Sequence, residues 1–127
     1  MPSTQQQTSP LIVLVEEEGD ERQAIARHLQ EAGFQVAEAE DSDAAMALLK
    51  KHSDVHGLVT DAHVPGKIDG FELAELARNR WPNLAVIMMS GHSDAVSGPV
   101  PEGAEFVAKP YLTSHLVPTL SRLLGRA

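Results

Sequence analysis

LIVLVEEE, residues 11–18, is a continuous apolar run rich in β-branched residues that ends abruptly in three glutamates. A short apolar run without alternation is typical of a strand buried on both faces, as in a parallel sheet covered by helices. Three more apolar runs end at a polar residue: residues 58–60 at Asp61, residues 84–89 at Ser90, and residues 106–108 at Lys109. Because ligands of an open parallel sheet bind beyond the carboxyl ends of its strands, we expect these polar side chains to line one crevice.

Strand and helix patterns alternate along the chain. Apolar residues at helical spacing follow the first run, and Gly33 is placed to end that helix. A strand over residues 34–39 precedes a second helix, for which Ser42 is the expected N-cap. Asp69 is the expected N-cap of a third helix, and the clearest helical stripe lies in residues 116–124 near the end of the chain.

The segment between the last two strands breaks this alternation. Residues 91–105 (GHSDAVSGPVPEGAE) include Pro99 and Pro101, each of which lacks a backbone donor and would clash with the preceding helical turn. A fourth helix of ordinary length is therefore excluded, and we expect a loop or at most one turn.

Buried strands that alternate with helices require parallel pairing through right-handed crossovers. We therefore expect an α/β fold, a flavodoxin-like doubly wound sheet of five parallel strands in the order 2-1-3-4-5, with the fourth helix shortened or missing. A Rossmann dinucleotide fold fits worse, because no G-x-G-x-x-G follows the first strand and the glutamates at residues 16–18 would repel a pyrophosphate. The P-loop pattern is absent from the sequence too.

Length, charge and composition restrict the class of protein. The 127 residues suit one domain over residues 11–127, and the polar start MPSTQQQTSP (residues 1–10) is expected to be a disordered leader. A net charge of -8 argues against direct binding to nucleic acid or a membrane surface, and no apolar run is long enough to span a bilayer. The absence of cysteine excludes disulfides and fits a cytoplasmic location.

Four motifs, taken in order, resemble the receiver domain of two-component response regulators. They are VLVEEE (residues 13–18), VTDAHVPGKIDG (59–70), VIMMSGH (86–92) and FVAKP (106–110). Each motif is weakly specific alone, but their order and spacing together are highly specific. The resemblance covers the chain from Leu11 to about Leu124.

The resemblance implies a role for each polar strand end. Asp61 would accept a phosphoryl group, and Mg²⁺ would be held by Glu16, Glu17, Asp61 and the backbone carbonyl of His63. Ser90 and Lys109 would contact the phosphoryl group, and Phe106 would be the aromatic residue that switches with it. Pro110 would be the cis proline after the lysine, and the imidazoles of His63 and His92 would tune the lifetime of the phosphoryl group. The two imidazoles could instead bind a transition metal.

Elementary chemistry supports the same set of residues. Mg²⁺ prefers hard oxygen ligands, and a cation offsets the repulsion between an ionised aspartate and an incoming phosphoryl group. Lys109 would supply a compact positive charge, and Ser90 would supply one hydrogen bond.

Two features depart from the family pattern. The family nearly always has aspartate where Glu17 stands, and the longer side chain would weaken Mg²⁺ binding, make the contact water-mediated, or shift preference to Mn²⁺. In the family, the fourth helix contributes to the usual signalling face. Its expected shortening here therefore implies a different output surface.

The sequence favours a stand-alone receiver that takes a phosphoryl group from a histidine kinase or histidine phosphotransfer protein and signals to a protein partner by conformational change. It does not favour an enzyme. The main alternative is a degenerate pseudo-receiver that binds other proteins independently of phosphorylation. A haloacid-dehalogenase-like phosphatase fits poorly, because it would need a second aspartate where His63 stands.

Overall fold

The computed structural model describes residues 9–91, 100–109 and 112–125 of the chain. These residues form five strands and four helices: β1 (Leu11–Val15), α1 (Gly19–Glu31), β2 (Gln35–Ala39), α2 (Ser42–Lys51), β3 (Val55–Asp61), α3 (Gly70–Arg80), β4 (Ala85–Ser90), β5 (Glu105–Ala108) and α4 (Leu112–Leu123). The strands form one parallel sheet in the order β2-β1-β3-β4-β5. The predicted flavodoxin-like fold and its strand order are confirmed. Most of the predicted leader lies outside the described residues.

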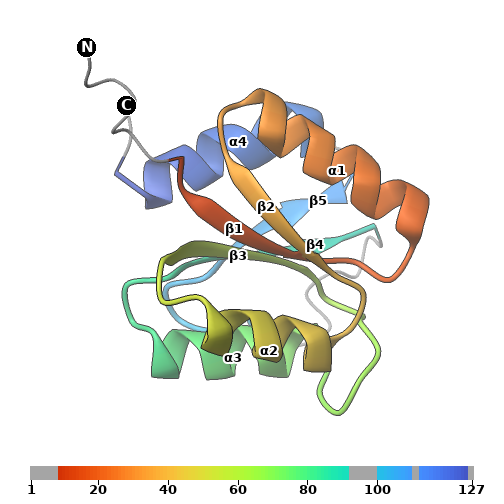
Figure 1. Cartoon of the computed structure of the whole chain (residues 1–127), viewed down its shortest axis with the longest axis vertical. Coiled ribbons are helices and arrows are strands. Elements are labelled where there is room, and N and C mark those ends of the chain that lie inside the picture. Colours follow the sequence, from red (N-terminus) through yellow and green to blue (C-terminus); the bar gives the residue numbers. More distant parts are fainter. Residues whose placement is uncertain (1–8, 92–99, 110–111, 126–127) are drawn as a thin grey trace.

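Helices cover both faces of the sheet, with α1 and α4 on one side and α2 and α3 on the other (Figure 1). Alternate residues of β1 point to opposite faces, so Ile12 and Leu14 join one apolar cluster while Val13 and Val15 join the other. The four residues 12–15 are all fully buried, as the continuous apolar run predicts. No helix in the described part of the chain is long and apolar enough to cross a membrane.

Side-chain caps begin the two helices on the α2–α3 face. The carboxylate of Asp69 accepts a 2.9 Å hydrogen bond from the Glu72 N–H, and Glu72 accepts one of 3.1 Å from the Asp69 N–H. This capping box confirms Asp69 as an N-cap. The prediction for α2 is wrong, because its N-cap is Asp41, which accepts a 2.7 Å hydrogen bond from the Ala44 N–H. Ser42 is instead the first helical residue.

The buried hydroxyl of Ser42 has a tertiary role in place of the expected cap. It accepts a 3.4 Å hydrogen bond from the backbone N–H of Ile68, in the loop between β3 and α3. The N–H of Ser42 donates to the carbonyl of Pro65 in the same loop at 3.0 Å. The start of α2 therefore fixes the loop that follows Asp61.

The connection from β4 to β5 contains no helix among its described residues, which are Gly91 and residues 100–104. A turn at Glu102 and Gly103 leads into β5, and residues 92–99 lie outside the described part. The structure thus agrees with the predicted break in the helical pattern, as far as the described residues extend.

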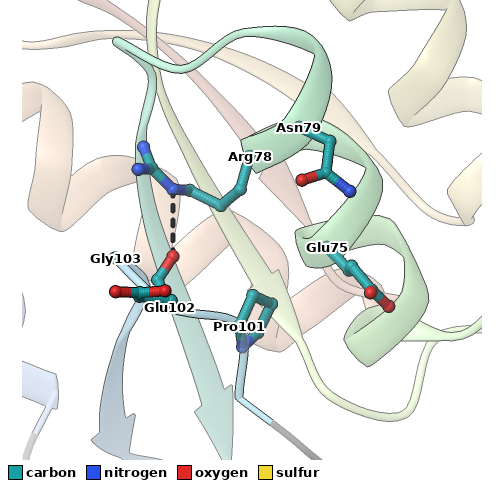
Figure 2. Close-up of a pocket in the computed structure, with 6 residues that line it drawn as sticks. All are labelled: Glu75, Arg78, Asn79, Pro101, Glu102 and Gly103. Carbon is teal, nitrogen blue, oxygen red and sulfur yellow. Dashed lines mark hydrogen bonds between the residues drawn. The ribbon is translucent and has the colours of Figure 1, made fainter.

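Arg78 of α3 anchors this turn. Figure 2 shows its side chain reaching from the helix to the turn, where Nε donates to the carbonyl of Glu102 at 3.4 Å. Nη1 also donates to the carbonyls of Pro82 and Leu84 at 2.7 and 3.0 Å. A side chain at Gly103 would displace the guanidinium, because its Cβ would lie 2.6 Å from Nη2. Arg78 thereby fixes the start of β5, the strand that leads to Lys109.

Candidate functional site

The carboxyl ends of four neighbouring strands bring polar residues to one edge of the sheet. The β1–β3 register sets Val15 beside Thr60, so Glu16 and Asp61 follow as neighbours. Ser90 at the end of β4 pairs with Ala108, after which Lys109 leaves β5. The sheet therefore brings these strand-end residues together, although they are far apart in sequence.

Lys109 lies at the centre of a cluster of three carboxylates. Its Nζ is 2.8 Å from Oε1 of Glu16, 3.1 Å from Oε2 of Glu21 and 3.4 Å from Oδ2 of Asp61. An ammonium group has three N–H donors, so each carboxylate can receive one. One positive charge among three negative charges leaves the cluster with an excess of negative charge.

The surroundings of Lys109 keep it charged. Burial alone would lower its pKa, because burial disfavours the charged form. Hydrogen bonds to Glu16 and Glu21, together with the attraction of Asp61 and Glu16, outweigh burial and raise the pKa of Lys109 above its ordinary value. The side chain is therefore a cation throughout the physiological pH range.

The two glutamates predicted to bind metal differ in their surroundings. The side chain of Glu16 is 4% exposed, and its second oxygen accepts a 3.1 Å hydrogen bond from the Glu18 N–H. Glu17 is exposed to solvent. Glu16 is therefore held inside the crevice by two contacts, whereas Glu17 is open to water.

Asp61 ends β3 with a side chain that is 14% exposed. One carboxylate oxygen faces Lys109, and the other accepts a 3.5 Å hydrogen bond from the backbone N–H of His63. The imidazole of His63 is exposed, and its ring meets Phe71 edge-on with centroids 6.1 Å apart. Asp61 thus combines partial access to solvent with a neighbouring cation and a backbone donor.

Helix α3 begins directly against the backbone of Asp61. A Cβ at Gly70 would overlap the carbonyl oxygen of Asp61 and would lie 2.8 Å from the backbone of Ala62. The Gly70 N–H donates to the carbonyl of Ala62 at 3.0 Å. This close approach requires glycine, so Gly70 sets the position of α3 relative to Asp61.

The other predicted site residues are placed as follows. Ser90 is fully buried at the end of β4, and Phe106 is partly buried against the apolar cluster on the α2–α3 face. His92 and the predicted cis proline Pro110 lie outside the described residues. The phosphoryl contact of Ser90 and the switching of Phe106 stay predictions.

The donor atoms suit a hard cation. Glu16 and Asp61 share Lys109, so two carboxylates meet at the crevice, and Mg²⁺ commonly takes one or two carboxylates with water completing its shell. The described part of the chain contains no group of three or more His, Cys, Asp or Glu residues that could hold a metal ion. Glu16 and Asp61 therefore fit Mg²⁺ in type, while Glu17 and the His63 carbonyl stay predicted ligands.

Glu21 is a member of the cluster that the sequence did not single out. It lies in the first turn of α1, directly after the strand end that carries Glu16. In an α/β fold, helix starts adjoin the carboxyl ends of the preceding strands. An acidic residue in that turn was therefore the available signal, but the position of its side chain depends on the rotation of α1.

Known proteins resemble this chain in fold, and the similarity extends over most of its length. The family model described as the response regulator receiver domain matches residues 12–121. A response regulator receiver protein from Sinorhizobium medicae WSM419 has a similar structure, with a TM-score of 0.82 and 28% identity over 92% of this chain and 95% of that one.

Curated relatives extend the comparison. The response regulator receiver protein CpdR of Brucella abortus is 28% identical over 116 residues, which cover 89% of this chain and 95% of CpdR. The hydrogenase transcriptional regulatory protein HoxA of Cupriavidus necator is 30% identical over 113 residues, which cover 86% of this chain but 23% of HoxA. The chain spans about a quarter of the length of the first curated relatives that it matches.

Proposed function

The chain belongs to the response regulator receiver domain family of two-component systems, and we propose from this membership that Asp61 accepts a phosphoryl group. The domain would then signal by conformational change. The observation that carries the proposal is the contact of Lys109 with both Asp61 and Glu16. A partly exposed carboxylate beside a fixed cation suits attack on phosphorus, since the cation can stabilise the charge on the transferring oxygens.

In the proposed reaction, a carboxylate oxygen of Asp61 attacks the phosphorus of a phosphohistidine. The P–N bond breaks, its electron pair leaves with the imidazole nitrogen, and an acyl phosphate forms on Asp61. Lys109 and the His63 N–H contact different oxygens of the Asp61 carboxylate, so together they orient the nucleophile. Water later attacks the phosphorus, releasing inorganic phosphate and restoring the carboxylate.

Glu16 and Asp61, with Glu17 and the His63 carbonyl, would hold a divalent cation, Mg²⁺ or Mn²⁺. A bound cation would supply charge stabilisation for the phosphoryl oxygens. The excess of negative charge around Lys109 supports this assignment, because a second positive charge would offset it. The exposure of Glu17 leaves its longer side chain free to adapt to the metal or to contact it through water.

The phosphodonor would be a histidine kinase or a histidine phosphotransfer protein, as family membership suggests. The domain would act as a phosphoacceptor rather than as a turnover enzyme, because the aspartate itself carries the group between partners. Its downstream target would be another protein. Its contact surface would differ from the usual signalling face of the family, because the β4–β5 connection has no helix among its described residues.

A phosphorylation-independent binding module is the second candidate function. The lack of a group of three metal-binding side chains in the described ranges favours it. In such a module the Lys109 cluster would stabilise the fold without exchanging its contacts.

Intact mass measurement after incubation with acetyl phosphate separates the two functions. The wild type would be treated with Mg²⁺, with Mn²⁺ and with chelator, beside Asp61→Asn and the control Asp54→Asn, which changes an exposed aspartate just before the same strand. We expect a cation-dependent phosphoryl adduct in the wild type and Asp54→Asn, and none in Asp61→Asn. The absence of a phosphoryl adduct on the wild type under every condition would favour the binding module.

A further inference from the structure

We propose that Glu21 is a regulatory carboxylate of this site, which holds Lys109 while Asp61 is unmodified and competes with the phosphoryl group for the same ammonium. This inference rests on the proposed phosphorylation of Asp61. It adds to that site a residue outside the four sequence motifs.

Glu21 reaches Lys109 from an ordered first turn of α1. Its N–H donates to the carboxylate of the N-cap Glu18 at 2.7 Å, which fixes the backbone of the turn. Its Oε2 lies 3.1 Å from Lys109 Nζ, closer than the 3.4 Å between Lys109 and Asp61. In the unmodified protein, Lys109 is therefore held more closely by Glu16 and Glu21 than by the proposed phosphoacceptor.

Phosphorylation of Asp61 would change which groups receive the three hydrogen-bond donors of Lys109. All three donors of an ammonium can be engaged by the three carboxylates around it. A phosphoryl group brings up to two negative charges and three strong acceptor oxygens. Lys109 can donate to one phosphoryl oxygen with the donor that Asp61 gives up, but it can donate to a second phosphoryl oxygen only by releasing a glutamate.

Burial decides which of the glutamates gives way. The side chain of Glu16 is 4% exposed, and a buried carboxylate that loses its cation is strongly unfavourable. The side chain of Glu21 is 38% exposed, so water can solvate it after Lys109 moves, and an exposed ion pair contributes little stability. Glu21 is therefore the glutamate that releases Lys109, and Glu16 is the one that keeps it.

Glu21 opposes the bound phosphoryl group in two ways. It occupies a donor of Lys109 beforehand, and its negative charge remains close afterwards. Glu21 and Asp61 both lie within 3.4 Å of the same nitrogen, so their separation is less than the Debye length of roughly 8 Å at physiological salt. Repulsion between Glu21 and a phosphoryl group on Asp61 is thus only partly screened.

Titration with beryllium fluoride in the presence of Mg²⁺, followed by fluorine NMR, tests this role, since the ion mimics a phosphoryl group without covalent transfer. We expect Glu21→Gln to bind the mimic roughly fivefold more tightly than the wild type, because the substitution removes one nearby charge. The control Asp20→Asn removes the same charge from the adjacent, exposed residue of the same turn and should stay within about twofold.

Salt dependence separates an electrostatic role from a structural one. The affinity gap between Glu21→Gln and the wild type should narrow when salt is raised from about 0.05 to about 0.5 M, because screening shortens the reach of charge. A gap that persists at high salt, an unchanged affinity in Glu21→Gln, or an equal effect of Asp20→Asn would overturn the role of Glu21. These results would leave the proposed function standing if the wild type binds the mimic. A wild type that neither binds it nor is phosphorylated would overturn both.

Discussion

Replacing Lys109 by methionine tests how strongly the ion cluster contributes to the fold. Methionine keeps an unbranched side chain of similar reach and removes the charge. The stem of Lys109 passes near Gly91, since a Cβ built on the glycine would lie 3.6 Å from Cδ of the lysine, and methionine keeps an apolar stem at this place. Glu16, whose side chain is 4% exposed, would then lose the one cation that pairs with it among the described residues.

The expected loss follows from the burial of each carboxylate. Breaking a buried ion pair by removing one partner costs about 3–5 kcal/mol, because the other charge is left uncompensated. Glu16 keeps its hydrogen bond from the Glu18 N–H, and Asp61 keeps the one from the His63 N–H. Glu21, at 38% exposed, contributes little to the loss. We therefore expect Lys109→Met to lower the free energy of unfolding by about 3 kcal/mol.

Urea unfolding followed by circular dichroism at pH 7 without divalent cations measures this loss. Adding Glu16→Gln to Lys109→Met should recover most of it, because a neutral amide requires no cation. The control Lys50→Met changes an exposed lysine in α2 and should stay within about 0.5 kcal/mol of the wild type. A loss below about 1 kcal/mol, or an equal loss in the Glu16→Gln background, would contradict the role of Lys109 as the counter-ion of Glu16.

Three further predictions concern packing, anchoring and pH. In thermal unfolding, Gly70→Ala should destabilise the fold by about 2–3 kcal/mol, because its Cβ would overlap the Asp61 backbone. The control Gly19→Ala, at the open start of α1, should be neutral or stabilising in the same assay. Arg78→Ala should cost about 2 kcal/mol by removing hydrogen bonds to three backbone carbonyls, and a mutant melting like the wild type would argue against this anchor. Because the folded pKa of Lys109 is raised, its stabilising contribution should be complete below the unfolded value of about 10.4 and should decline as pH rises above it. Urea unfolding of the wild type and Lys109→Met from pH 7 to about 11 measures this contribution as the difference between their free energies of unfolding. This difference should narrow only at the alkaline end, and a narrowing near pH 7 would contradict the raised pKa of Lys109.

The sheet and the convergence of its strand ends could be predicted because their causes are local. Uninterrupted apolar runs such as residues 11–15 have to be buried on both faces, and this requirement dictates parallel strands with helices on either side. Asp69 could be identified as a cap because Glu72 completes the capping box within the same turn.

The errors and omissions arise where tertiary contacts decide. Asp41 and Ser42 are both good N-cap residues, and the hydrogen bond between Ser42 and the loop at Ile68 favours Asp41 as the cap. The position of Glu21 depends on how α1 is rotated and on how far Lys109 reaches from β5, which no local pattern encodes. The different exposure of Glu16 and Glu17 likewise follows from how the chain turns after β1.

Reductive trapping of the phosphorylated residue decides whether Asp61 is the phosphoacceptor. After incubation with acetyl phosphate and Mg²⁺, borohydride converts an aspartyl phosphate to homoserine, which peptide mass spectrometry can locate in the chain. We expect homoserine at position 61, and we expect none when chelator replaces Mg²⁺. Trapping at another carboxylate, or none in a protein that is folded and metal-loaded, would contradict it.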